Sequence, residues 1–407
     1  MKNERLLDAI GDIEDELISN AVNDTKTKKK GGWLRWGGIA ACLAAAVLFG
    51  LQFIPKEKSV IQTGPLVKIT VPEQVKGDMG LGNVSAYDAS EFVSGNPWNE
   101  NTELTTLPVY KNTLTYVYNG TYEVLGADFD KMRERLLEVA KRLGLDTDNL
   151  TITDDSPDEA TKQQIIEKFK IIGEPVPDAY FKPTRLMAET NGIMMEVDME
   201  MTVTISFEPT VTLPDQYNYT HYAPYENYVA VSKYLKEEYK ELIGMDAPQV
   251  SIEGGDYNID HKQDYNIEFF EGYGNQVEKI VNYNYNKVMF YCDESGRLSM
   301  ARVVKTDLSK KMGDYPVITV SKAQELLLAG KYITSVCDEM PEKDYIKKVE
   351  LVYGIGWEEE YYIPYYRFYV ELPKEKGDDG MNSYGYYYVP AIDGAYISNM
   401  PTPNLEN

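Results

Sequence analysis

The sequence has few of the residues on which catalytic sites depend. Only two histidines, His221 and His261, and three cysteines occur in 407 residues. Neither histidine has a serine or cysteine neighbour in a known motif, and the chain contains no Gly-x-Ser-x-Gly, phosphate-binding-loop or His-Glu-x-x-His pattern. We therefore expect no enzyme activity and no cofactor, and we expect both histidines to have surface or hydrogen-bonding roles.

Runs of metal ligands are equally scarce. Asp256, Asn258 and Asp260 begin like a calcium-binding loop, but His261 stands where such a loop needs glycine. Ile267 stands where the loop needs a bidentate glutamate. We expect a polar hairpin loop at this place and no metal site.

Basic residues are outnumbered. The chain has 41 Lys and Arg against 65 Asp and Glu, which gives a net charge of −24. A surface of this charge repels nucleic acids and anionic lipids, so nucleic acid is not an expected partner. Residues 1–35 carry seven basic and seven acidic groups, so the whole excess lies beyond them. The difference in charge between residues 1–35 and the rest of the chain indicates that they lie in different compartments.

Long apolar runs are absent except for one, from Trp36 to Ile54, which contains no charge. Its nineteen residues reach about 28 Å as a helix, close to the roughly 30 Å of a bilayer's hydrocarbon core. Lysines gather before the run, whereas an acidic region follows it. The sequence therefore predicts a single transmembrane helix over 36–54, with a cytoplasmic N-terminus and an extracytoplasmic main region in the cell envelope.

Two other interpretations of the apolar run are less favoured. A cleaved secretory signal has a short leader, but about 35 residues precede this run. Ile39 to Cys42 resembles a lipoprotein box, although most of the apolar residues follow the cysteine. We expect a permanent anchor, with Cys42 packed inside the bilayer.

A short amphipathic helix is predicted in the cytoplasmic segment. Leu6, Ile10, Ile13 and Leu17 are spaced by four, three and four residues, which places them on one helix face. A helix this short is marginal alone in water, so the face should rest on something. Two alternatives stay open, the membrane surface and a cytoplasmic partner protein.

The order of "LLDAIGDIEDELI", a lysine run, "WLRWGGIAACLAAAVL" and an acidic exported region resembles a group of poorly characterised single-pass membrane proteins of Gram-positive bacteria. Some members of this group are similar to anti-sigma factors, which hold a transcription factor at the membrane through a short cytoplasmic segment. The resemblance implies a regulatory protein with a cytoplasmic partner.

Helix and strand signals alternate in the exported region. Helices are predicted over 128–143, 158–172 and 227–243, with a fourth that begins at Ser321 and ends before Gly330. Two or three strands follow each of the later helices, which predicts an α+β fold of antiparallel sheets with helices on one face, built from repeated α-β-β-β units. This order, with Tyr-rich final strands, resembles PepSY-type extracytoplasmic domains. The expected organisation is a cytoplasmic segment (1–35), an anchor (36–54), a juxtamembrane tether (55–106) and three units (107–222, 223–310 and 311–407).

The segment "VDMEMTVTISF" shows the clearest strand pattern. Its apolar residues, from Val197 to Phe207, alternate strictly with polar ones. Asn191-Gly192 just before it is a two-residue hairpin signal. We expect a half-buried strand over 197–207.

Tyrosine is unusually frequent, with 33 residues, many of them in the final strands. Tyrosine suits half-exposed sheet faces, which is one explanation. The other is a ligand site in which Tyr365, Tyr369 and Tyr387 line an exposed groove for an envelope glycan or peptide. The two differ in whether these three side chains converge.

Cys292 and Cys337 are the only cysteines after the anchor. Outside the cytoplasm they could form a disulfide worth about 3 to 4 kcal/mol. The alternative is that both are small buried apolar residues.

Three classes of function remain. The single span, the amphipathic helix and the lack of catalytic motifs favour a membrane-anchored sensor or regulatory protein, in which the exported region reports to the cytoplasmic helix. The alternative is an envelope protein that binds glycan or peptide or has a structural role. An exported enzyme is the least favoured.

The predicted topology can be tested by cysteine labelling of intact cells. A cysteine introduced within residues 1–30 should not react with an impermeant reagent, because the positive-inside bias holds it in the cytoplasm. A cysteine introduced within residues 370–380 should react. The reverse result would show that the orientation is wrong.

Overall fold

The computed structural model describes residues 65–72, 83–118, 122–336, 340–354, 359–376 and 380–401. These residues belong to one compact unit, Gly64–Asn407. The predicted anchor, 36–54, and the predicted helix face of Leu6, Ile10, Ile13 and Leu17 lie outside the described residues. Within the described ranges, no helix has both the length and the apolar character that a membrane span requires.

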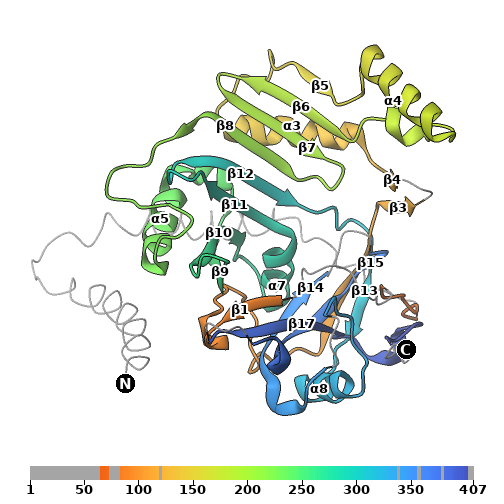
Figure 1. The fold of residues 1–407 in the computed structure, drawn as a ribbon, viewed down its shortest axis with the longest axis vertical. Coiled ribbons are helices and arrows are strands. Elements are labelled where there is room, and N and C mark those ends of the chain that lie inside the picture. The colour runs from red at the N-terminus through yellow and green to blue at the C-terminus, as the bar shows by residue number, and fades with distance from the viewer. Residues whose placement is uncertain are drawn as a thin grey trace, which may run out of the picture. The chain divides into compact units, whose positions relative to one another are not determined.

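The middle of the chain forms an eight-stranded antiparallel sheet (Figure 1). One half of the sheet consists of the edge strand β5 and the consecutive strands β6, β7 and β8. The other half consists of β9, β10, β11 and β12. The two halves join where β8 pairs with β12, with Ile205 opposite Ala301. In spatial order the strands are β5 (Ile152–Asp154), β6 (Arg185–Thr190), β7 (Ile193–Asp198), β8 (Val203–Val211), β12 (Leu298–Lys305), β11 (Asn286–Cys292), β10 (Gln263–Glu271) and β9 (Pro248–Tyr257).

Three helices pack against this sheet in one apolar cluster: α3 (Phe129–Arg142), α5 (Tyr225–Glu238) and α6 (Lys240–Ile243). Asp128 caps α3 by accepting a hydrogen bond from the Lys131 amide, and Gly244 ends α6 in the left-handed conformation. Met132 and Leu235 are fully buried in the cluster. The helices predicted at 128–143 and 227–243 are confirmed, the second with a break at Tyr239.

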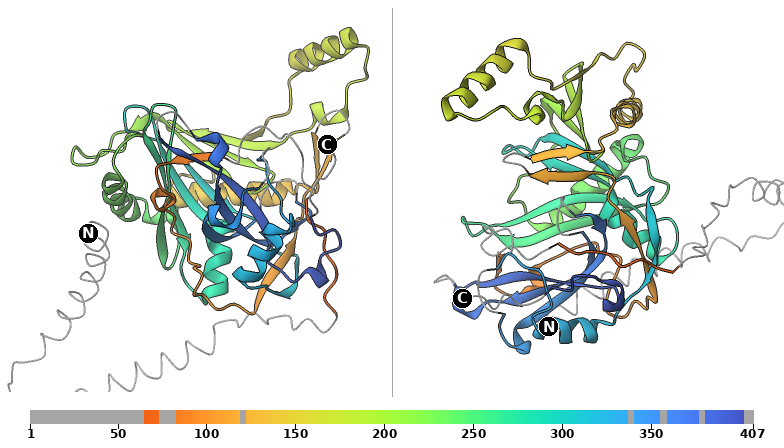
Figure 2. Two further views of the ribbon diagram at one scale, coloured as in Figure 1. Left: turned by 60° about the horizontal axis from the view of Figure 1, so that its bottom comes forward. Right: turned by 90° about the vertical axis from the view of Figure 1, so that its right-hand side faces the viewer.

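Helix α4 (Glu159–Ile172) differs from the other helices. The prediction of a helix over 158–172 is confirmed, with Asp158 as its cap and Gly173 at its end. It buries none of its residues, because it stands out from the sheet in the excursion between β5 and β6 (Figure 2).

The residues before and after the middle of the chain fold together. Strands from both ends pair in a four-stranded sheet, β1 (Asn83–Ala86), β17 (Asn382–Pro390), β16 (Pro364–Glu371) and β14 (Ile346–Tyr353). They pair again in a three-stranded sheet, β13 (Lys311–Pro316), β2 (Thr106–Lys111) and β15 (Tyr361–Tyr362). We refer to residues 65–118 and 311–401 as the flanking part and to residues 128–305 as the middle part. The short hairpin of β3 (Thr115–Tyr118) and β4 (Tyr122–Leu125) leads from one to the other.

Two helices cover the flanking part, α7 (Gln276–Tyr285) and α8 (Val320–Leu328), which share its apolar cluster. Thr319, not Ser321, caps α8, because its side chain accepts the Lys322 amide. Helix α7 begins with a capping box of Asn275 and Glu278, a signal that the sequence carries and that the predicted helices did not include.

The expected α+β fold of repeated α-β-β-β units is wrong. Strands hold 36% of the described residues and helices 26%, and the described chain contains six α-helices among large antiparallel sheets. The sequence pattern predicted the Asn191-Gly192 hairpin, but it did not predict the pairing of strands that are distant in the chain. β1 pairs with β17, and β2 pairs with β13 and β15, so the sheets are assembled across the whole described chain.

The described part of the predicted tether, 65–72 and 83–106, is packed into the fold. Ile69 is fully buried and forms backbone hydrogen bonds with Tyr396 and Ser398. Phe92 and Trp98 are also buried. The Gly, Pro, Ser and Asn content predicted a loop correctly in places, but these apolar residues anchor the segment.

A buried polar seam joins the flanking and middle parts. The Glu350 carboxylate on β14 is ion-paired with Arg367 and with Lys348 (2.9 Å), and it accepts a hydrogen bond from Tyr369. Ser94 donates to the same carboxylate (2.7 Å). The next residue, Gly95, donates its amide to Ser251 Oγ on β9, so the segment around residue 95 links the two parts.

The predicted strand over 197–207 is two strands. Asn191 and Gly192 turn the β6–β7 hairpin with positive φ angles of 52° and 75°, as predicted. A second turn interrupts the segment at 199–202, because Asp198 accepts hydrogen bonds from the amides of Glu200 and Thr202. Strict alternation of apolar residues conceals this turn.

The register of β8 can be tested by charge insertion. Ile205 is fully buried between Met195 and Ala301, whereas Thr204 is half-buried on the opposite face. Ile205→Asp should lower the free energy of unfolding by about 3 to 5 kcal/mol, because it buries an unpaired charge. Thr204→Asp should cost less than about 1 kcal/mol. Urea denaturation measures both, and equal losses would contradict the register.

The seam should make stability depend on pH. Burial alone would raise the pKa of Glu350, but Arg367 and Lys348 lower it to about 2. The group therefore stabilises the folded state above its unfolded pKa of 4.5, and this contribution is lost as the pH falls toward 2. We expect a loss of about 3 kcal/mol between pH 6 and pH 2 from this group, measured by urea denaturation.

Glu350→Gln should remove that part of the pH dependence, besides lowering stability at pH 7 by leaving Arg367 without its partner. Glu294→Gln, in the exposed turn between β11 and β12, is the matched control and should keep the wild-type slope. A wild-type slope in Glu350→Gln would refute the assignment.

Candidate functional site

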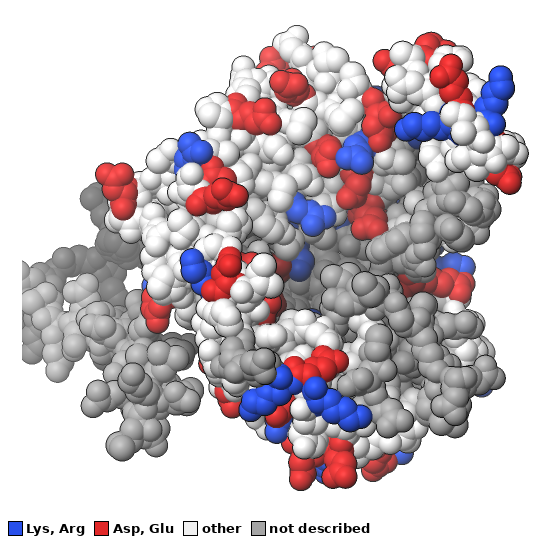
Figure 3. All heavy atoms as spheres, viewed as in Figure 1, with Lys and Arg blue, Asp and Glu red and all other residues white. Residues whose placement is uncertain are grey.

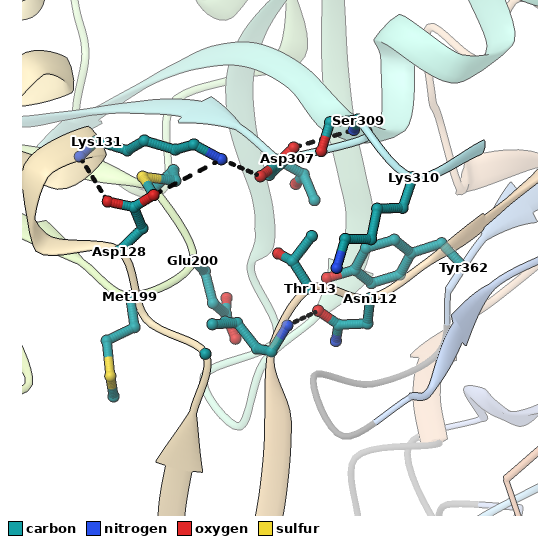
Figure 4. Close-up of a pocket in the computed structure, with 14 residues that line it drawn as sticks. Asn112, Thr113, Asp128, Lys131, Met199, Glu200, Asp307, Ser309, Lys310 and Tyr362 are labelled. Atoms are coloured by element: carbon teal, nitrogen blue, oxygen red, sulfur yellow. Dashed lines mark hydrogen bonds and ion pairs between the residues drawn. The ribbon is translucent and has the colours of Figure 1, made fainter.

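A pocket of about 260 Å³ lies where the flanking and middle parts meet (Figure 4). Its walls come from the residues after β2, the start of α3, the β7–β8 turn, the connection 306–310 between β12 and β13, and Tyr362 of β15. Its size is slightly below the range of roughly 300–1,000 Å³ that is usual for small-molecule sites. The pocket therefore suits a small ligand.

Both places where the chain passes between the two parts line this pocket. The chain enters the middle part through Gly126 and Asp128, and it returns through residues 306–310. Gly126 has a φ of 91°, and a Cβ there would lie 2.5 Å from the carbonyl oxygen of Thr113. Only glycine allows these two strands of the wall to approach so closely.

One wall of the pocket is an ion-pair cluster. Lys131 Nζ lies 3.1 Å from Asp307 and 3.8 Å from Asp128. The Asp307 hydrogen bond and charge raise the pKa of Lys131. Partial burial would raise the pKa of Asp307, but hydrogen bonds from Ser309 and Lys131 lower it. The three groups satisfy one another, and they connect α3 to the return segment.

The opposite wall carries an acidic group with no cation beside it. Glu200, in the β7–β8 turn, accepts a hydrogen bond from Tyr116 Oη (2.9 Å) and forms no ion pair with any described residue. Burial and then the charge of Glu200 raise the pKa of Tyr116. Burial raises the pKa of Tyr362 as well, and Glu200 is the largest charge effect on it. The potential on this side of the pocket is negative.

Lys310 supplies the complementary charge. Its ammonium makes no ion pair or hydrogen bond within the described ranges, and the structure places it in the pocket wall opposite Glu200 (Figure 4). The two charges are too far apart to pair with each other. Acidic and basic side chains are mixed over the face of the molecule seen in Figure 3. The unpaired Glu200 and Lys310 are therefore a feature of the pocket and not part of a larger patch of one charge.

A second cavity, of about 340 Å³, lies over the four-stranded sheet. Its lysines are already engaged, Lys347 with Glu371 (3.1 Å) and Lys348 with Glu350 (2.9 Å). The first pocket is therefore the better candidate for a binding site.

The predicted tyrosine site is not assembled. Tyr365, Tyr369 and Tyr387 are all buried, with exposed fractions of 0%, 4% and 0%. They lie in three different apolar clusters. They do not converge on an exposed groove, and their main role is packing.

The histidines and the acidic loop have structural positions. The His221 ring lies 3.8 Å from the sulfur of Cys292, which is buried. The disulfide predicted with Cys337 stays a prediction, because Cys337 lies outside the described residues. The loop around Asn258 is a polar hairpin, as predicted, with Asn258 accepting the amides of Asp260 and Lys262. Among the described residues, no group of three or more His, Cys, Asp or Glu is arranged to hold a metal.

The residues of the pocket have no signal in the sequence. Asp128 enters the sequence analysis only as the first residue of the helix predicted over 128–143. Glu200, Asp307 and Lys310 stand in short polar connections that resemble other loops, and residues separated by up to 250 positions meet only through long-range strand pairing.

No model of a known protein family matches the chain, and a search of curated proteins finds no match either. The resemblances to anti-sigma-like membrane proteins and to PepSY-type domains stay predictions.

Proposed function

We propose that the chain is a membrane-anchored sensor or regulatory protein, of an anti-sigma-like type, whose exported region acts by binding a small ligand and not by catalysis. The observation that carries the proposal is the pocket between the flanking and middle parts. A ligand there contacts both connections between the parts, so its binding energy bears on how the parts are held together.

The anchor and the cytoplasmic segment complete the proposal. Residues 36–54 span the membrane with the N-terminus in the cytoplasm, and the region after the span faces the cell envelope. The helix face of Leu6, Ile10, Ile13 and Leu17 is the partner-docking site, and it binds a cytoplasmic regulatory protein. In this proposal the segment before the span passes the signal to the cytoplasm, so it needs a partner that binds it.

The alternative function, binding of an extended envelope glycan or peptide through tyrosines, has less support. The three tyrosines that would line such a site are buried in separate clusters. The small size and charged walls of the pocket favour a compact polar ligand.

The docking face can be tested by charge substitution in full-length protein in membranes. Changing Ile10 and Ile13 to Asp removes two central apolar contacts, each worth about 1.5 to 3 kcal/mol when fully buried. Affinity for the cytoplasmic partner should fall by more than about a hundredfold. Cross-linking in cells, followed by titration of the identified partner, measures the change.

Glu14 and Asp15 lie off the helix face, so Glu14→Gln with Asp15→Asn is the control and should keep most of the affinity. Membrane insertion must be unchanged in every variant. If the wild-type protein captures no partner, the regulatory proposal fails.

A further inference from the structure

We infer that the pocket binds a small zwitterion, a free amino acid or a dipeptide, with its ammonium at Glu200 and its carboxylate at Lys310. The inference rests on the proposed function, because it names the ligand class of the same pocket. It follows from three features of the walls: among the described residues, Glu200 has no cation beside it, Lys310 has no anion beside it, and the same pocket has some apolar lining.

The Glu200 side of the pocket suits an ammonium group. Tyr116 already fills one acceptor position of the Glu200 carboxylate, at 2.9 Å, and orients the carboxylate. The remaining oxygen positions have no cation among the described residues. Glu200 also has the largest charge effect on the pKa of Tyr362, which stands on β15 in another part of the pocket wall. A ligand cation in this field gains a charge-assisted hydrogen bond.

The Lys310 side suits a carboxylate. The Lys310 ammonium is unpaired among the described residues, and the hydroxyl groups of Thr113 and Ser309 line the same pocket. The Thr113 hydroxyl forms no hydrogen bond to another described residue and can donate to a bound carboxylate, whereas the Ser309 hydroxyl is hydrogen-bonded to Asp307. Lys131, the other lysine of the pocket, is held by Asp307 at 3.1 Å and is not available to the ligand.

The remaining walls set the size of the ligand. Leu114, Met199 and Met201 contribute apolar surface to the pocket wall. Methionine side chains adapt to different shapes, so short aliphatic side chains are accommodated without a single fixed fit. A volume of about 260 Å³ leaves room for an amino acid or a dipeptide.

The test is calorimetric titration of the full-length protein in nanodiscs with L-alanine and L-alanyl-L-alanine. Each compound is compared with its N-acetyl form, which lacks the ammonium, and with its amide, which lacks the carboxylate. At least one zwitterion should bind about tenfold or more tighter than both of its one-charge analogues.

Two substitutions assign the two ends of the ligand. Glu200→Gln should remove the preference over the N-acetyl form and keep the preference over the amide. Lys310→Gln should do the opposite. Lys233→Gln and Glu237→Gln on the exposed side of α5 are the matched controls, and both preferences should survive in them.

Three results would overturn the inference: no binding of either zwitterion, equal binding of the zwitterion and its analogues, or preferences that survive both pocket substitutions. These results are separate from those for the proposed function. If cysteine labelling supports the anchor and the partner is lost from the Ile10 and Ile13 variant, the regulatory proposal stands even when no zwitterion binds. If zwitterions bind and no partner is captured, the pocket assignment stands alone.

Discussion

The fold depends on keeping one buried carboxylate charged. Glu350 is 4% exposed, and a charge at that depth is stable only with cations and hydrogen-bond donors around it. Arg367 and Lys348 provide the cations from the same sheet, while Ser94 comes from a segment more than 250 residues earlier in the chain. The carboxylate therefore requires the beginning of the exported region to pack against its end.

This requirement explains why the flanking part packs against the middle part. The segment that carries Ser94 also contains Gly95, whose amide binds Ser251 of the eight-stranded sheet, and a Cβ on Gly95 would lie 2.6 Å from that hydroxyl oxygen. Tyr283 and Ser251 both donate to Glu253, which continues the polar seam into the middle part. One thin segment thus satisfies buried polar groups on both sides, and it fixes the edge strand β9 against the flanking part.

Local features were predictable from the sequence, and long-range ones were not. Asp128, Gly244 and the Asn191-Gly192 pair act within a few residues, so their patterns identify helix ends and a hairpin. The turn after Asp198 was not predictable, because the apolar residues alternate strictly through it. Only the hydrogen bonds that the Asp198 side chain accepts mark the turn. Strands such as β2 and β15 are about 250 residues apart, so their pairing depends on long-range packing and not on a local pattern. The pocket depends on the same pairing, because it brings Tyr362 of β15 close to the residues after β2.

The energetics of the pocket suit reversible binding. The Lys131–Asp307 pair that ties α3 to the return connection has a lysine side chain that is 53% exposed, and exposed ion pairs contribute about 0 to 1 kcal/mol. The link between the two connections is therefore weak compared with the buried Glu350 seam. In our inference, a ligand between Glu200 and Lys310 adds polar contacts beside this weak link. Under this inference, ligand binding changes how the two connections are held to each other. The buried Glu350 seam keeps the flanking and middle parts together.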